Sequence, residues 1–216
     1  EGAKDFNAAL HDLVVREIKA HKRIIFNGNN YAPEWAEEAE KRGLLNLKNA
    51  AEALPHFADK KNIELFERNK VFTEREVVTR TDIMLENYSK VLNIEALTMI
   101  DMAKQDIYPA VESYIASLCG ALKEKKGTLP GVSFPAQERM IAKLASDAER
   151  MLERAEMLDS LLVESKAHET PAKLALFFAE KVIPVMQELR AYADGMELNT
   201  AASVWPFPTY GEILFS

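Results

Sequence analysis

Residues 141–162 read IAKLASDAERMLERAEMLDSLL, and this stretch decides the fold. Its apolar residues recur at alternating intervals of three and four positions, and charged residues fill most of the others. The spacing places one apolar stripe on one face of a helix, as in coiled coils and helical bundles. It therefore predicts a long helix whose stripe faces other helices. The stripe consists of Ile141, Leu144, Ala148, Met151, Ala155, Leu158 and Leu162.

Two further long helices are predicted on either side of this one. Residues 73–122 open with the capping-box pattern Thr73-Glu-Arg-Glu76 and carry apolar residues every three or four positions. Residues 170–195 open with a threonine followed by a proline, which suits a helix start. Pro109 and Pro184 lie inside these helices and predict a kink in each.

The predicted fold class is therefore all-α, an antiparallel bundle of long, partly proline-kinked helices. Residues 1–72 form a first segment of shorter helices, and residues 73–195 form the long-helix bundle. Residues 196–216 form an extended aromatic tail, because Pro206 and Pro208 disfavour helix. We expect this tail to dock on protein through its large apolar side chains, which are Trp205, Phe207, Tyr210, Leu214 and Phe215.

Composition limits the classes of function. The 216 residues are 48% hydrophobic and 28% charged, with a net charge of −7. This balance favours a folded domain and disfavours nucleic acid or an anionic membrane as partner. The one cysteine, Cys119, lies in an apolar helical run, where we expect it to pack in the core. With no second cysteine, no internal disulfide can form, and we expect a cytoplasmic protein.

The sequence offers no pattern typical of a catalytic or metal site. A carboxylate-bridged metal bundle requires Glu-x-x-His, and none of the four histidines has an acidic residue three positions before it. Asn27-Gly28 belongs to no phosphate-binding loop and predicts a turn. We therefore predict no catalytic, cofactor-binding or metal-binding residue in this chain.

Short motifs along nearly the whole chain resemble the C-terminal region of type III glutamine synthetases, the large-subunit class. They occur in the family's order, so the set is more specific than any one of them. The motifs are RIIFNGNNY at 23–31, EW at 34–35 with EA at 38–39, KRGL at 41–44, LFE at 65–67, VFT at 71–73, ENY at 86–88, NIE at 93–95, and WPFPTY at 205–210 with ILF at 213–215.

This resemblance implies a parent enzyme that joins glutamate and ammonia with ATP and Mg²⁺ or Mn²⁺. It also implies that the catalytic residues lie upstream, in a core adjoining residues 1–72, and that sibling subunits assemble into rings. The chain begins with Glu1 rather than methionine, so we expect part of a longer protein. The expected function is a non-catalytic helical domain with a structural or assembly role. The alternative is a free-standing helical module that binds another protein; a metal-dependent bundle enzyme is disfavoured by the missing ligand motifs.

Overall fold

The structure is a computed structural model that describes residues 5–215; residues 1–4 and 216, which fall in the first and last predicted segments, lie outside it. The described residues form helices and no strand, which confirms the predicted all-α class. The chain divides into two compact units, Glu1–Lys48 and Asn49–Ser216.

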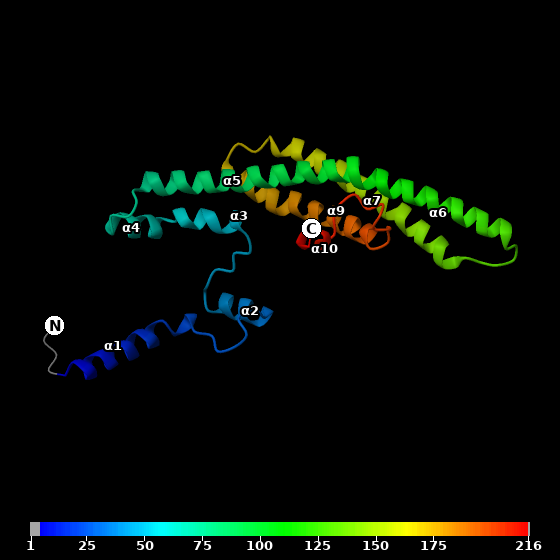
Figure 1. The fold of residues 1–216 in the computed structure, drawn as a ribbon. Coiled ribbons are helices and arrows are strands. Elements are labelled where there is room, and N and C mark those ends of the chain that lie inside the picture. The colour runs from blue at the N-terminus through cyan, green and yellow to red at the C-terminus, as the bar shows by residue number, and fades with distance from the viewer. Residues whose placement is uncertain (1–4, 216) are drawn as a thin grey trace. The chain divides into compact units, whose positions relative to one another are not determined.

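Three long rods form the second unit (Figure 1). The chain runs out along α5 and α6, returns along α7, and reverses again through α8 and α9. The rods are α5 (Glu74–Asp101) with η3 (Met102–Ile107) and α6 (Tyr108–Thr128); α7 (Pro135–Ser165); and α8 (Pro171–Phe177) with η4 (Phe178–Val182) and α9 (Ile183–Glu197).

The middle rod, α7, carries the predicted stripe into the core. The stripe is buried at every position except Ile141, which is half-buried. Leu144, Met151 and Leu158 are fully buried. The helix contacts α9 most extensively and then α6 and α5, so its stripe is covered from several sides. No helix among residues 5–215 is both long and apolar enough to cross a membrane.

Both internal prolines follow a stretch of π-helix. The segment η3 ends two residues before Pro109, and η4 ends two residues before Pro184. A proline has no N–H to donate and its ring crowds the carbonyl four residues earlier, so the preceding turn widens. Figure 1 shows the first rod changing direction between α5 and α6, in the region of the predicted kink.

Short helices complete the second unit: α3 (Ala50–Ala53), η2 (Leu54–Ala58) and α4 (Lys60–Arg68). They contact α5, and Ala51 is buried with Leu85 of α5 and Ala175 of α8. Residues 49–72, which were predicted to belong to the first segment, pack with the long helices instead. Burial, followed by the negative charge of Glu52, raises the pKa of Tyr88 on α5.

The first unit has a small core built around Arg42. The unit comprises α1 (Phe6–Ala20), η1 (Lys22–Ile24) and α2 (Pro33–Lys41). Phe26 and Trp35 stack with ring centroids 4.6 Å apart. The Arg42 guanidinium lies 5.8 Å from the Trp35 ring and donates to the Ile25 carbonyl at 2.7 Å. This cluster fastens α2 to the segment before it.

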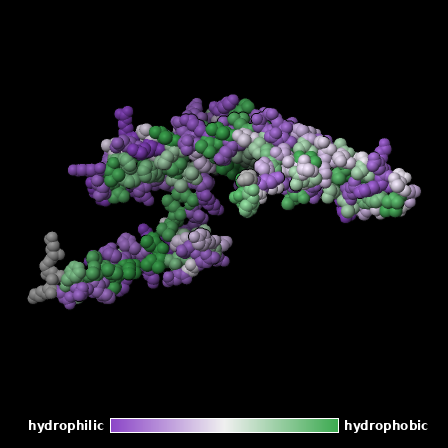
Figure 2. Space-filling view, in the orientation of Figure 1, coloured by the Kyte–Doolittle hydropathy of each residue, from purple (hydrophilic) through white to green (hydrophobic). Residues whose placement is uncertain are grey.

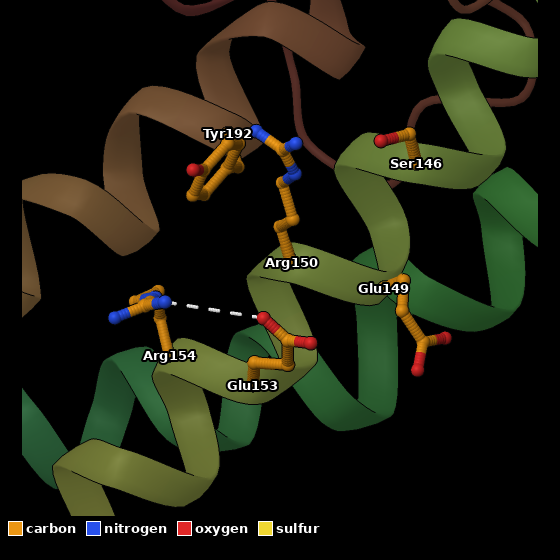
Figure 3. Close-up of a pocket in the computed structure, with 6 residues that line it drawn as sticks. All are labelled: Ser146, Glu149, Arg150, Glu153, Arg154 and Tyr192. Atoms are coloured by element: carbon orange, nitrogen blue, oxygen red, sulfur yellow. Dashed lines mark ion pairs between the residues drawn. The ribbon is translucent and has the colours of Figure 1, made fainter.

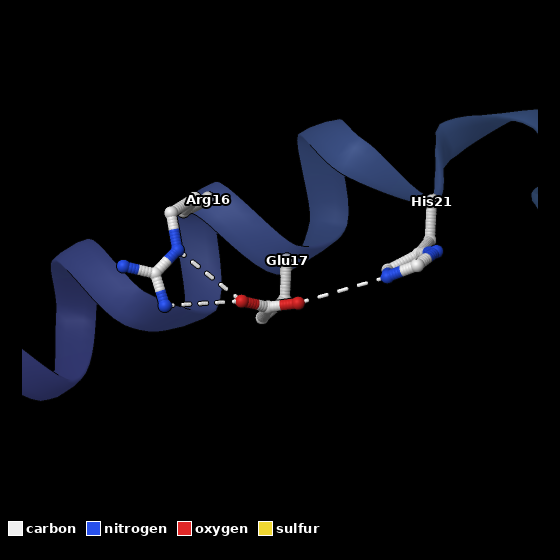
Figure 4. Close-up of polar contacts among 3 residues, drawn as sticks. All are labelled: Arg16, Glu17 and His21. Carbon is white, nitrogen blue, oxygen red and sulfur yellow. Dashed lines mark hydrogen bonds and ion pairs between the residues drawn. The ribbon is translucent and has the colours of Figure 1, made fainter.

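The helix α1 buries none of its own residues. Near its C-terminal end, Glu17 accepts from Arg16 at 3.1 Å and lies 3.6 Å from His21 (Figure 4). An apolar stripe runs along the helix, and Figure 2 shows it as a green band. Every residue of this α1 stripe is at least 43% exposed: Phe6, Leu10, Leu13, Val14 and Ile18.

The buried stripe of α7 is tested by Leu158→Asp. This side chain is 0% exposed, so the substitution buries a carboxylate that has no partner. We expect a loss of several kcal/mol in the free energy of unfolding, measured by urea denaturation. The matched control is Val163→Asp on the same helix, where the side chain is 63% exposed and the change should stay within about 0.5 kcal/mol. Equal stability of the two variants would contradict the packing of α7.

Candidate functional site

The candidate site is a surface groove that lies where the C-terminal tail crosses the helical bundle. The helix α9 ends at Glu197, and Asn199 closes it by donating its side-chain amide to the Gly195 carbonyl at 2.7 Å. The chain then turns back, and Trp205 donates its backbone N–H to the Ala201 carbonyl at 3.1 Å. This turn sets the following residues beside α9, as the red segment of Figure 1 shows.

The tail then forms a short helix, α10 (Tyr210–Leu214). Thr209 and Glu212 form a capping box in which the Thr209 N–H donates to the Glu212 carboxylate at 2.7 Å and the Glu212 N–H donates to the Thr209 hydroxyl at 3.3 Å. The first of these bonds, and then the Thr209 hydroxyl, lower the pKa of Glu212. The predicted extended tail is therefore wrong over Tyr210–Leu214, where Thr209-x-x-Glu212 repeats the capping pattern that identified Thr73.

The five predicted docking residues divide into two groups. Trp205 and Phe207 are half-buried against the bundle core, and their rings meet edge to face with centroids 6.3 Å apart. Tyr210, Leu214 and Phe215 are 83%, 71% and 88% exposed. Two anchors therefore hold the tail on its own bundle. Docking of the other three on a further protein surface stays a prediction.

The tail groove itself has a volume of about 840 Å³. Its floor comes from α5, η3 and α9, and the tail with α10 forms one wall. Most of the floor is apolar, including three flexible methionines, Met99, Met102 and Met186. The volume lies within the range of small-molecule sites in proteins, roughly 300–1,000 Å³.

A second, more polar hollow of about 490 Å³ lies between α7 and α9 (Figure 3). Arg154 pairs with Glu188 at 3.3 Å and with Glu153 at 3.9 Å, while Arg150 extends beside the Tyr192 ring. The Nε atom of Arg154 is buried without a hydrogen-bond partner in the described chain. Glu149 also lines the hollow. The carboxylates of the hollow therefore offset its two guanidinium groups, and the net electrostatic attraction for an anion is small.

The titratable groups singled out in the sequence are scattered. Among residues 5–215, no group of three or more His, Cys, Asp or Glu side chains could hold a metal ion. His56 lies 3.0 Å from Asp59, and the ring of His168 stacks beside Phe177. The prediction for Cys119 is wrong: the thiol is exposed on α6, because Val111, Tyr114, Ile115 and Leu118 fill the face that meets α7.

Residues 9–126 match the model of the family described as glutamine synthetase C-terminal domain. A glutamine synthetase of Butyrivibrio fibrisolvens is 36% identical over 208 residues, and the type-3 glutamine synthetase of Dictyostelium discoideum is 30% identical over 214. These alignments cover 95% and 97% of this chain. The chain spans only 29% of the length of either relative.

The two tail anchors are tested by Trp205→Ala, with Tyr210→Ala as the matched control. Trp205 packs on the bundle core, whereas Tyr210 is 83% exposed. Removing a half-buried indole should lower the free energy of unfolding by about 1–2 kcal/mol, and removing the exposed phenol should change it by under about 0.5 kcal/mol. Thermal melts of both variants give the comparison. A Trp205→Ala variant as stable as the parent would show that the tail is not anchored there.

Proposed function

Because the chain belongs to the glutamine synthetase C-terminal domain family, we propose that it is the non-catalytic helical domain of a glutamate–ammonia ligase. Its role is structural: it supports the fold or the assembly of the enzyme's subunits. The matching family model and the long relatives support this assignment. The activity, glutamine formation from glutamate, ammonia and ATP, belongs to the whole polypeptide.

The observation that carries the structural role is the exposed α1 stripe. Five apolar side chains on one face of a fifteen-residue helix contact no buried core in the described chain. A helix this short is marginal in water by itself, and an apolar stripe of this kind is normally covered by protein. The chain spans 29% of its relatives' length, so most of such a protein lies outside these residues. We propose that the remaining part of the protein, the catalytic core, packs on the α1 stripe and covers it.

We assign the binding sites for the metal ion and the nucleotide of the reaction to the same remaining part of the polypeptide. Mg²⁺ and Mn²⁺ are bound by clustered oxygen ligands. The described residues offer no such cluster, so they do not fit the ion, and the tail groove has no Gly-rich loop that could cradle phosphates. We therefore assign no step of the proposed reaction to residues 5–215.

The proposed partners are the catalytic core of the same polypeptide and sibling subunits of a homo-oligomer in the cytoplasm. Tyr210, Leu214 and Phe215 of the tail are exposed, and the two that do not line the tail groove, Leu214 and Phe215, are a second surface that such contacts would cover. The alternative, a free-standing module that binds another protein, also predicts a covered apolar surface. The two proposals differ in what happens to glutamine formation when the α1 stripe is damaged.

The proposal is tested by the double substitution Leu10→Glu and Val14→Glu in the complete polypeptide. Both residues lie on the α1 stripe and are 45% and 46% exposed in this chain. If the stripe packs on the catalytic core, two buried charges should cost several kcal/mol and reduce soluble assembled enzyme and glutamine formation together. Size-exclusion chromatography and an assay of glutamine formation are the measurements.

The matched control places charge on the other side of the same helix, Ala8→Glu with Lys19→Glu. Both residues are exposed and lie off the stripe. The control should assemble and form glutamine as the parent does. If the stripe variant behaves like the control, the α1 stripe does not contact the catalytic core. If the complete polypeptide forms no glutamine even without substitutions, the assignment to a glutamate–ammonia ligase is wrong.

A further inference from the structure

We propose that the tail groove binds a small amphipathic cation, a molecule with an apolar body and one positively charged end. Nothing in the proposed structural role requires such a ligand. The groove between α5, α9 and the tail has a size, a lining and a charge that suit such a molecule.

The apolar body is accommodated by the floor of the groove. A volume of about 840 Å³ matches a drug-sized molecule. Met99, Met102 and Met186 line it, and unbranched thioether side chains adjust to different apolar shapes. The floor also lies along η3, where the widened π-helical turn departs from regular helix packing. Such turns occur often at functional sites.

The mouth of the groove stays open although the tail crosses it. Tyr210 and Ile213 of α10 line the groove, yet they are 83% and 58% exposed. The tail is thus fixed at Trp205 and Phe207, where it forms one side of the groove and does not fill it. A ligand can enter beside α10 without displacing the two anchors.

The preference for a cation comes from the charges around the mouth. The lining includes three carboxylates, Glu95, Asp194 and Glu197, and one cation, Arg190. The Arg190 guanidinium is held by Asp194 at 3.4 Å, so the other two carboxylates dominate the local charge. The indole of Trp205 adds an aromatic ring to the same lining, and aromatic faces attract alkylammonium groups. An anion of the same shape would lack both attractions.

Photo-crosslinking tests the site directly. The probe is a benzophenone joined by an alkyl chain to a trimethylammonium group, and its counterpart carries a sulfonate instead. Each is irradiated with the complete polypeptide, and labelled peptides are identified by mass spectrometry. We expect the ammonium probe to label the segments of α5, α9 and the tail that line the groove. We expect the sulfonate probe to label them at least tenfold less.

A blocking variant with a matched control locates the site. Thr98→Trp places an indole in the groove, while Thr79→Trp places the same indole on an exposed position of α5 away from it. Labelling of the groove peptides should fall at least tenfold in the first variant and stay unchanged in the second. Equal labelling in Thr98→Trp and parent would overturn the proposal, and so would absence of labelling in the parent.

A further variant tests whether the carboxylates of the groove select the cation. The double substitution Glu95→Gln and Glu197→Gln keeps the shape of the groove and removes its excess negative charge; Glu112→Gln, exposed on α6, is the control. The preference for the ammonium probe should disappear in the first and persist in the second. The comparison of these variants still tests the proposal if Thr98→Trp destabilises the protein and lowers its melting temperature. A preference that survives the double substitution would contradict the assignment of a cation. Glutamine formation is not read out, so failure here is distinct from failure of the proposed structural role.

Discussion

The structure depends on one constraint: the apolar stripe of α7 has to be covered along its whole length. A single neighbouring helix covers only part of such a stripe, and α7 accordingly contacts α9, α6 and α5. Each buried leucine or methionine of the stripe contributes about 1.5–3 kcal/mol relative to an exposed one. The positions of the other long helices follow, because each must bring its own apolar face to α7. The loop before Pro135 and the Thr170 cap reverse the chain so that it can do so.

The features with functional interest lie where this packing is interrupted or incomplete. The π-helical segments before Pro109 and Pro184 widen the two outer rods, and the tail groove lies along the first of them. The tail adds two anchors to the bundle and leaves α10 with its apolar residues in solvent. In the first unit, the Arg42 cluster fixes α2 but leaves the α1 stripe uncovered. A surface of that kind is expected in a domain that needs a larger protein around it.

The periodic parts of the fold were predictable from sequence, and the local exceptions were less so. The stripe of α7 and the capping box at Thr73 identified a buried face and a helix start that the structure contains. The helix α10 was missed because two prolines before it outweighed the capping pattern at Thr209. Cys119 was misplaced because hydrophobicity alone does not say which face of α6 meets α7. The groove has no sequence pattern, since its lining comes from segments far apart in the chain.

Native-state hydrogen exchange tests the central claim most directly, because it measures the free energy of opening at each amide. If the α7 stripe organises the bundle, amides near Leu158 on α7 and near Leu189 on α9 should exchange at one common slow rate, set by global unfolding. Amides of α10 should exchange much faster, through local opening. The account would be contradicted if amides near Leu158 exchanged as fast as those of α10 while α5 and α9 remained protected.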